Sequence, residues 1–174
     1  RLGFITEPWT VYTPSVFGEY RAELADPLTV ILAARFDKHT YTDYMFSPRI
    51  SVLMEMTDID LLKLNIGQST RKAGDEELRA QWIIPGSVYP ENEMIKYMEL
   101  RWEETPRENL LLASTAFYYL HDVIGFTGST SQSTLLGTFE SWGYELEAVY
   151  VNDSTYYTVS HSYTKLIDGE LVNP

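Results

Sequence analysis

The sequence predicts an all-β protein, an antiparallel up-and-down meander of about eight strands. Apolar and polar residues alternate with period 2 along most of the chain, as in half-buried strands. The 13 Tyr, 7 Phe and 4 Trp residues also favour strands over helices. Short and longer connections alternate along the chain. In a meander, every second connection lies on the same rim of the sheet. Alternating lengths are therefore expected when one rim carries short turns and the other carries longer loops.

The first four strands are predicted from alternation that begins at Val16. Residues of one parity are apolar, as in Leu28, Val30 and Leu32, and their neighbours are more polar. The connection around Ala25-Asp26-Pro27 is tight, the next one is of medium length, and the third, at Thr57 to Asp60, is tight again. These strands are expected at 16–24, 28–37, 46–55 and 62–67.

Of the last four strands, two alternate clearly, whereas 110–119 is apolar on both faces and 155–164 alternates weakly. A long connection at 69–93, in which no helix is expected, precedes them, and another long connection at 121–135 is rich in Gly, Ser and Thr at its centre. Thr105 to Asn109 and Asn152 to Ser154 form tight turns. These strands are expected at 97–103, 110–119, 142–150 and 155–164.

Composition limits the classes of protein that the chain can belong to. Its 174 residues suit one domain, and 44% hydrophobic residues exclude a disordered chain. The net charge of −12 argues against a nucleic-acid partner, because phosphates would be repelled. The absence of Cys excludes disulfides and thiolate sites. The longest nearly apolar stretch, Leu28 to Phe36, is far shorter than the roughly 20 residues of a membrane helix.

The polar side of the strands carries charges of both signs, often two residues apart. Such a face suits the solvent side of a soluble sheet, and it equally suits a lumen lined by ion pairs. Aromatic residues near the strand ends, among them Trp9, Phe46, Tyr97 and Trp102, suit an interfacial girdle. The candidate lumen-lining residues are Arg35, Asp37, Arg49, Glu55, Lys63, Glu99, Arg101, Glu145 and Glu147.

Residues that could perform catalysis are scarce. The three histidines are isolated in sequence, so we expect no metal site, and we expect no cofactor. Glu145 and Glu147 share one face of a strand, the arrangement of paired carboxylates in a glycoside-hydrolysing or carbohydrate-binding β-sandwich. The preferred interpretation is that they pair with basic groups such as Arg101 on a neighbouring strand. We therefore expect no enzymatic activity.

Several segments in order resemble the β-barrel of TonB-dependent outer-membrane receptors. The resemblance spans about residues 28–164, and its parts are 32–37 (LAARFD), 46–49 (FSPR), 62–67 (LKLNIG) and 143–147 (GYELE). Two positions depart from the family pattern: Ala33 stands where Gly is usual, and Ala73 stands where Pro is expected after Arg71.

The resemblance implies that residues 1–174 are a partial barrel domain, about a third of the wall of a 22-stranded transmembrane β-barrel. The plug domain, the TonB box and the final strands would lie outside it. The implied function is receptor and transporter for TonB-dependent uptake of a scarce nutrient, most plausibly a ferric siderophore, in the outer membrane of a Gram-negative bacterium. The implied partners are outer-membrane lipid, a small-molecule metal chelate, and TonB through the missing N-terminal region.

The longer connections would then form an external vestibule. Aromatic residues contact flat ligands well, and a cation attracts an anionic chelate. The ligand-contact candidates on these connections are Tyr41, Tyr44, Arg71, Trp82 and Tyr89.

Overall fold

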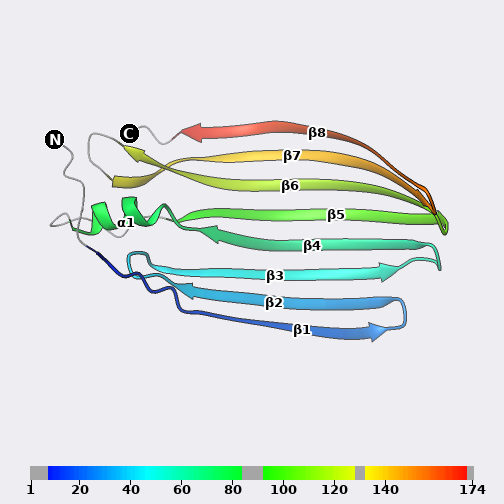
Figure 1. Ribbon diagram of the computed structural model, residues 1–174, viewed down its shortest axis with the longest axis horizontal. Helices are drawn as coiled ribbons and strands as arrows, with labels where there is room; N and C mark the ends of the chain where they lie inside the picture. Colours follow the sequence, from blue (N-terminus) through cyan, green and yellow to red (C-terminus); the bar gives the residue numbers. More distant parts are fainter. Residues whose placement is uncertain (1–7, 84–91, 128–131, 172–174) are drawn as a thin grey trace.

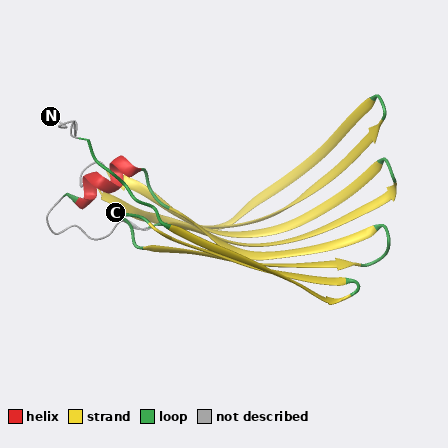
Figure 2. Cartoon of the chain, turned by 60° about the horizontal axis from the view of Figure 1, so that its bottom comes forward, coloured by secondary structure: helices red, strands yellow, loops and turns green. Residues whose placement is uncertain are grey.

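The computed structural model describes residues 8–83, 92–127 and 132–171. Eight strands form a single antiparallel sheet in chain order, which confirms the predicted meander. Figure 1 shows the strands side by side, and Figure 2 shows that the sheet they form is strongly twisted and curved. The strands are β1 (Ser15–Ala25), β2 (Leu28–Lys38), β3 (Tyr44–Glu55), β4 (Asp60–Arg71), β5 (Glu93–Arg107), β6 (Leu110–Thr127), β7 (Gln132–Asn152) and β8 (Thr155–Leu171).

Connections of different length lie on opposite rims of the sheet. The short-turn rim joins β1 to β2, β3 to β4, β5 to β6 and β7 to β8, whereas the long-connection rim carries residues 39–43 and 72–83 (Figure 1). Side chains fix the short turns. The Asn152 carboxamide oxygen accepts hydrogen bonds from the Ser154 and Thr155 N–H groups at 3.0 and 2.8 Å. Short turns of this kind set the register of each hairpin.

The predicted long connection at 121–135 is wrong in length. β6 and β7 continue past it, from His121 opposite Phe139 to Thr127 opposite Gln132, with a bulge at Val123 and Ile124. Asp122 supports the extension, because its carboxylate accepts a hydrogen bond from the Thr138 hydroxyl at 2.8 Å. The Gly, Ser and Thr content suggested a loop, but strand pairing satisfies the backbone polar groups of these residues. Residues 128–131, between the two strands, lie outside the described residues.

The expectation of no helix in 69–93 is also wrong, because α1 spans Asp75–Trp82. Its first turn is acidic, which suits the positive end of the helix dipole, and the N–H of Gly74 donates to the Glu77 carboxylate at 3.3 Å. Only Leu78 and Gln81 are buried, so the helix has almost no apolar periodicity that could have predicted it. α1 contacts β7, so it reaches across the rim from its place between β4 and β5.

The strand register sorts the side chains into an apolar face and a polar face, because directly paired residues lie on the same side of a sheet. Ile50 pairs with Ile66, which pairs with Met98, which pairs with Tyr118, and similar rows cross the sheet above and below. The predicted row of Leu28, Val30, Leu32, Ala34 and Phe36 belongs to this apolar face.

The apolar face is the exposed one. Along β5, Met98, Leu100 and Trp102 are 49, 45 and 38% exposed. The side chains of Arg101 and Glu103, on the polar face of the same strand, are only 28 and 19% exposed. A soluble sheet shows the reverse pattern. Side chains crowd together on the inner side of a curved sheet, so the polar face is the concave one.

The alternative β-sandwich fold is wrong. The described residues form one sheet and no second layer, so nothing covers the apolar rows: Leu32 and Phe36 remain 47 and 40% exposed. No helix in the described part of the chain is long and apolar enough to cross a membrane.

Candidate functional site

The polar face collects all nine residues predicted to line a lumen. The register places Lys63 opposite Arg101, Asn65 opposite Glu99, and Thr115 opposite Glu145, and the other members occupy matching positions on their strands. Whether this face borders a lumen stays a prediction; that the nine side chains share it follows from the strand pairing.

An ion-pair network crosses the polar face from β4 to β7. Glu103 accepts hydrogen bonds from Lys63 and from Arg101, both at 2.7 Å, and Arg101 also donates to Glu147 at 3.0 Å. The expected pairing of Glu147 with Arg101 is therefore confirmed. Glu145 and Glu55 lie on the same face and make no ion pair with any described residue. A carboxyl group that acts as a general acid must carry a proton. The Glu147 carboxylate instead accepts a hydrogen bond from the Arg101 cation, an arrangement more typical of a structural ion pair in a barrel wall than of a catalytic pair of carboxylates.

A second cluster lies nearer the long-connection rim, on β1 to β3. Arg35 forms a bidentate pair with Asp37, with nitrogen–oxygen distances of 2.8 and 2.9 Å, and the Ser15 hydroxyl donates to the same carboxylate. Arg49 reaches Glu19 on β1 at 3.3 Å. The Arg35–Asp37 pair lies within β2, the Arg49–Glu19 pair reaches from β3 across β2 to β1, and together they leave a polar, charge-balanced surface.

Aromatic rings on the polar face lie over glycines of the neighbouring strand. A Cβ added to Gly67 would come within 2.6 Å of the Tyr97 hydroxyl, and one added to Gly143 would meet the ring of Phe117. Tyr97 was expected in an interfacial girdle on the apolar side; its register opposite Gly67 shows that this expectation is wrong. The glycines provide the space in which the rings lie flat on the wall.

On the long-connection rim, two of the predicted ligand-contact residues come together. The ring of Tyr41 lies 5.8 Å from that of Trp82 in α1 and 6.1 Å from that of Trp9. The guanidinium group of Arg79 lies 5.0 Å from the centre of the Trp9 ring. We call Trp9, Tyr41, Arg79 and Trp82 the rim cluster. Trp9 was expected in the girdle, and only the placement of α1 brings Arg79 and Trp82 to it.

The other predicted ligand contacts are dispersed. Tyr44 lies on the apolar face beside Phe36, with ring centres 5.2 Å apart, and is 61% exposed. Arg71 forms an ion pair with the buried Glu93 and lines a polar pocket of about 240 Å³ beside Gly74 and Glu77. Tyr89 lies outside the described residues.

His39 is fully buried under α1. Its Nδ1 accepts a hydrogen bond from the Tyr41 N–H at 3.2 Å, and its Nε2 lies 3.4 Å from the Asp75 carboxylate, which also pairs with Lys72. Burial lowers the pKa of His39 below its ordinary value. The charges of Lys72 and Lys38 lower this pKa further, whereas Asp75 opposes the shift.

We expect α1 to loosen from residues 39–43 as the pH falls. A depressed pKa means that the folded rim excludes a proton that the unfolded segment accepts, so the stability of this contact is lost below the unfolded pKa of about 6.5. Hydrogen exchange of the α1 amides, corrected for the pH dependence of the intrinsic rate, should show lower protection at pH 5.5 than at pH 7.5. The His39→Gln variant should show no such difference; an equal loss of protection in that variant would contradict the assignment to His39.

Among the described residues, no group of three His, Asp or Glu side chains is arranged to hold a metal ion. The polar face consists of paired charges, and the rim consists of aromatic rings with a nearby cation. This arrangement can bind and guide a polar ligand.

The comparisons with known proteins agree with this geometry. Residues 5–172 match the family described as TonB dependent receptor-like, beta-barrel. The fold is similar to that of the FrpB iron transporter from Neisseria meningitidis, in its F5-1 apoprotein form, with TM-score 0.72 and 15% identity over 92% of this chain and 26% of that one.

Two further solved structures have the same fold. The siderophore receptor PirA from Pseudomonas aeruginosa matches with TM-score 0.68 and 14% identity, over 90% of this chain and 34% of that chain. The alcaligin outer membrane receptor FauA from Bordetella pertussis matches with TM-score 0.62 and 15% identity, over 94% and 32%. The chain thus spans about a quarter to a third of these proteins. No match was found among curated proteins.

Proposed function

The chain belongs to the TonB-dependent receptor-like β-barrel family, and on this premise we propose that residues 1–174 form part of the wall of a 22-stranded barrel in the outer membrane of a Gram-negative bacterium. The plug domain, the TonB box and the remaining strands are then supplied by sequence outside these 174 residues, in keeping with the partial coverage of the similar structures.

The reversed exposure of the two faces is the observation that supports this proposal most strongly. In lipid, apolar side chains on the outer surface of a barrel are stable, and charged ones are stable only where water or partner charges meet them. The exposed rows of β2 to β7 and the paired charges of Lys63, Arg101, Glu103 and Glu147 fit that division. The nine lumen-lining candidates would then face the plug and the transport path.

The proposed activity is TonB-dependent uptake of a ferric siderophore. Three similar structures are an iron transporter, a siderophore receptor and an alcaligin receptor by their names. The long-connection rim would face outward, and its rim cluster offers aromatic rings and the Arg79 cation to an anionic chelate. Arg71 remains a ligand-contact candidate on the same rim, and Tyr89 remains a candidate outside the described residues. Tyr44, on the apolar face, is the weakest of the five.

Uptake by cells that express the complete receptor tests this function. We expect accumulation of iron from a radiolabelled ferric siderophore that disappears in a strain without TonB. The double variant Tyr41→Ala/Trp82→Ala should weaken binding of the chelate about tenfold or more, since aromatic contacts are frequent binding hot spots. Tyr156→Ala, which removes an exposed aromatic ring at the short-turn rim, is the control and should bind normally. Uptake that persists without TonB would contradict the proposal.

A further inference from the structure

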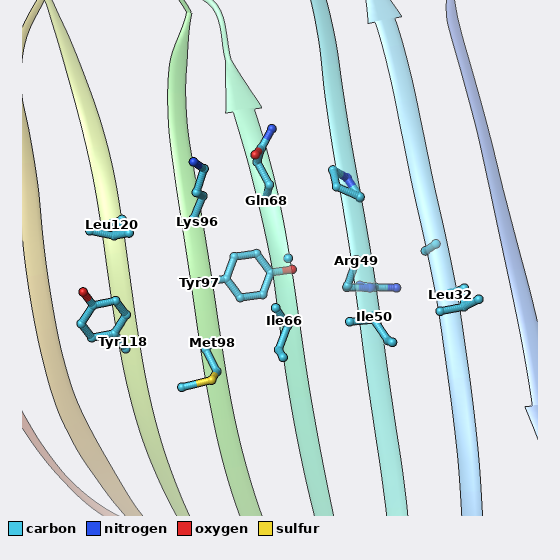
Figure 3. A pocket seen from close by; sticks show the side chains of 13 residues that line it. Leu32, Arg49, Ile50, Ile66, Gln68, Lys96, Tyr97, Met98, Tyr118 and Leu120 are labelled. Atoms are coloured by element: carbon cyan, nitrogen blue, oxygen red, sulfur yellow. The ribbon is translucent and has the colours of Figure 1, made fainter.

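An apolar groove lies mainly against the exposed face of the sheet, and Arg49 and Tyr97 of the polar face also contribute to its lining. Its volume is about 610 Å³, within the range of about 300–1,000 Å³ that small-molecule sites occupy. One row of its lining crosses the sheet from β2 to β6 and consists of Leu32, Ile50, Ile66, Met98 and Tyr118 (Figure 3).

The groove has a cause in the backbone between β3 and β4. Their direct pairing ends at Arg49 and Gly67, because Pro48, the next residue, has no N–H to donate. Beyond that point side chains connect the two strands: the Gln68 carboxamide and the Thr70 hydroxyl both donate to the Phe46 carbonyl, at 3.0 and 3.3 Å. The groove lies where the direct pairing of β3 and β4 stops, and apolar side chains around Pro48 form its border.

A cation lies at one end of the groove. Lys96 and Gln68 are paired across β4 and β5, and Figure 3 shows them together at the end nearer the long-connection rim. No carboxylate among the described residues forms an ion pair with Lys96. Glu140 lies in the same row of paired residues as Lys96, but Leu120 stands between them, so the two residues are about two strand spacings apart. The Glu140 carboxylate accepts a hydrogen bond from the Tyr118 hydroxyl.

We propose that this groove binds one lipid of the outer-facing leaflet, with an acyl chain against its apolar lining and an anionic phosphate headgroup at Lys96. The proposal rests on the proposed function in one respect, namely that the apolar face borders lipid. An unpaired lysine at the polar end of an apolar groove complements an acyl chain that ends in a negative headgroup. Gln68 and Lys96 lie one row nearer the long-connection rim than Ile66 and Met98, and Phe36 and Phe46 continue the apolar face in the row beyond them.

Native mass spectrometry of the complete receptor in detergent tests this site with two probes, phosphatidylglycerol and phosphatidylcholine of identical chains. We expect tighter binding of phosphatidylglycerol, and a loss of about fivefold in Lys96→Gln, the usual effect of one basic residue at a membrane surface. Ile66→Trp, which fills the groove, should weaken both lipids. Lys165→Gln removes a cation from the apolar face of β8, opposite Trp142 and outside the groove, and should change neither affinity.

Equal affinity of the wild type for the two lipids, or equal losses in Lys96→Gln and Lys165→Gln, would overturn the site. Siderophore uptake by the same variants separates this outcome from failure of the transport function. Lys96→Gln should transport normally, because Lys96 lies on the face opposite the ion pairs. A receptor that keeps its lipid preference without transporting iron would overturn the proposed function and leave the groove standing.

Discussion

Replacing Leu64 by Arg should destabilise the membrane-inserted barrel by about 2–4 kcal/mol, the cost of a cation on the lipid face near the bilayer midplane. Leu64 lies in the middle of the apolar side chains of β4, and its direct partners are Val52 and Leu100. No carboxylate partner lies in that row to offset the charge. Equilibrium unfolding of the complete barrel in phospholipid vesicles measures the change.

The adjacent residue provides the matched control. Asn65→Arg introduces the same side chain one position along β4 but on the polar face, where the direct partners are Ser51 and Glu99. A cross-strand Arg–Glu pair is neutral to slightly favourable, so the change should stay within about 1 kcal/mol. Equal costs at the two positions, or a larger cost at Asn65, would contradict the assignment of the faces.

Gly143→Ala should destabilise the barrel by about 3 kcal/mol, the upper end of the usual cost of overpacking. A Cβ at this position would overlap the Tyr163 carbonyl oxygen of β8 and the Phe117 ring of β6 at the same time. The ring can move, but the carbonyl belongs to the strand ladder and moves only with the backbone. The same unfolding experiment, with the loss of folded barrel on unheated gels as a second readout, measures the effect.

Gly18→Ala is the control for this prediction, since an added Cβ at Gly18 would meet no atom within 4 Å. It should be neutral or stabilising by about 0.4–1 kcal/mol, because Ala reduces the freedom of the unfolded chain. Adding Phe117→Leu to Gly143→Ala should recover part of the loss and not all of it. Full recovery would show that the backbone contact with Tyr163 costs nothing, against the expectation.

The sequence predicts the sheet well because alternation and turn residues are local signals. Leu28 to Phe36 alternate regularly, and Asn152 and Thr57 mark turns by chemistry that acts within a few residues. The same signals place all nine polar-face candidates correctly on one side of the sheet, since parity along a strand determines the side of each residue.

The rim could not be predicted in this way. α1 buries little besides Leu78 and Gln81, so its pattern is too weak to read, and its position depends on contacts with residues 39–43 and with β7. The rim cluster joins Trp9 to Trp82 through that placement alone. The ladder between β6 and β7 likewise overrides a composition typical of loops. These features depend on tertiary pairing, which no local pattern encodes.

The assignment of the exposed apolar face to lipid is the claim on which the other proposals depend. Spin labels placed one at a time at Leu64, Asn65, Glu99 and Leu100 of the complete barrel in vesicles test it through collisions with oxygen, which concentrates in lipid, and with a water-soluble nickel chelate. The account predicts oxygen access at Leu64 and Leu100 and nickel access, or protection from both reagents, at Asn65 and Glu99. Nickel access at Leu64 and Leu100, with oxygen access at Asn65 and Glu99, would contradict it.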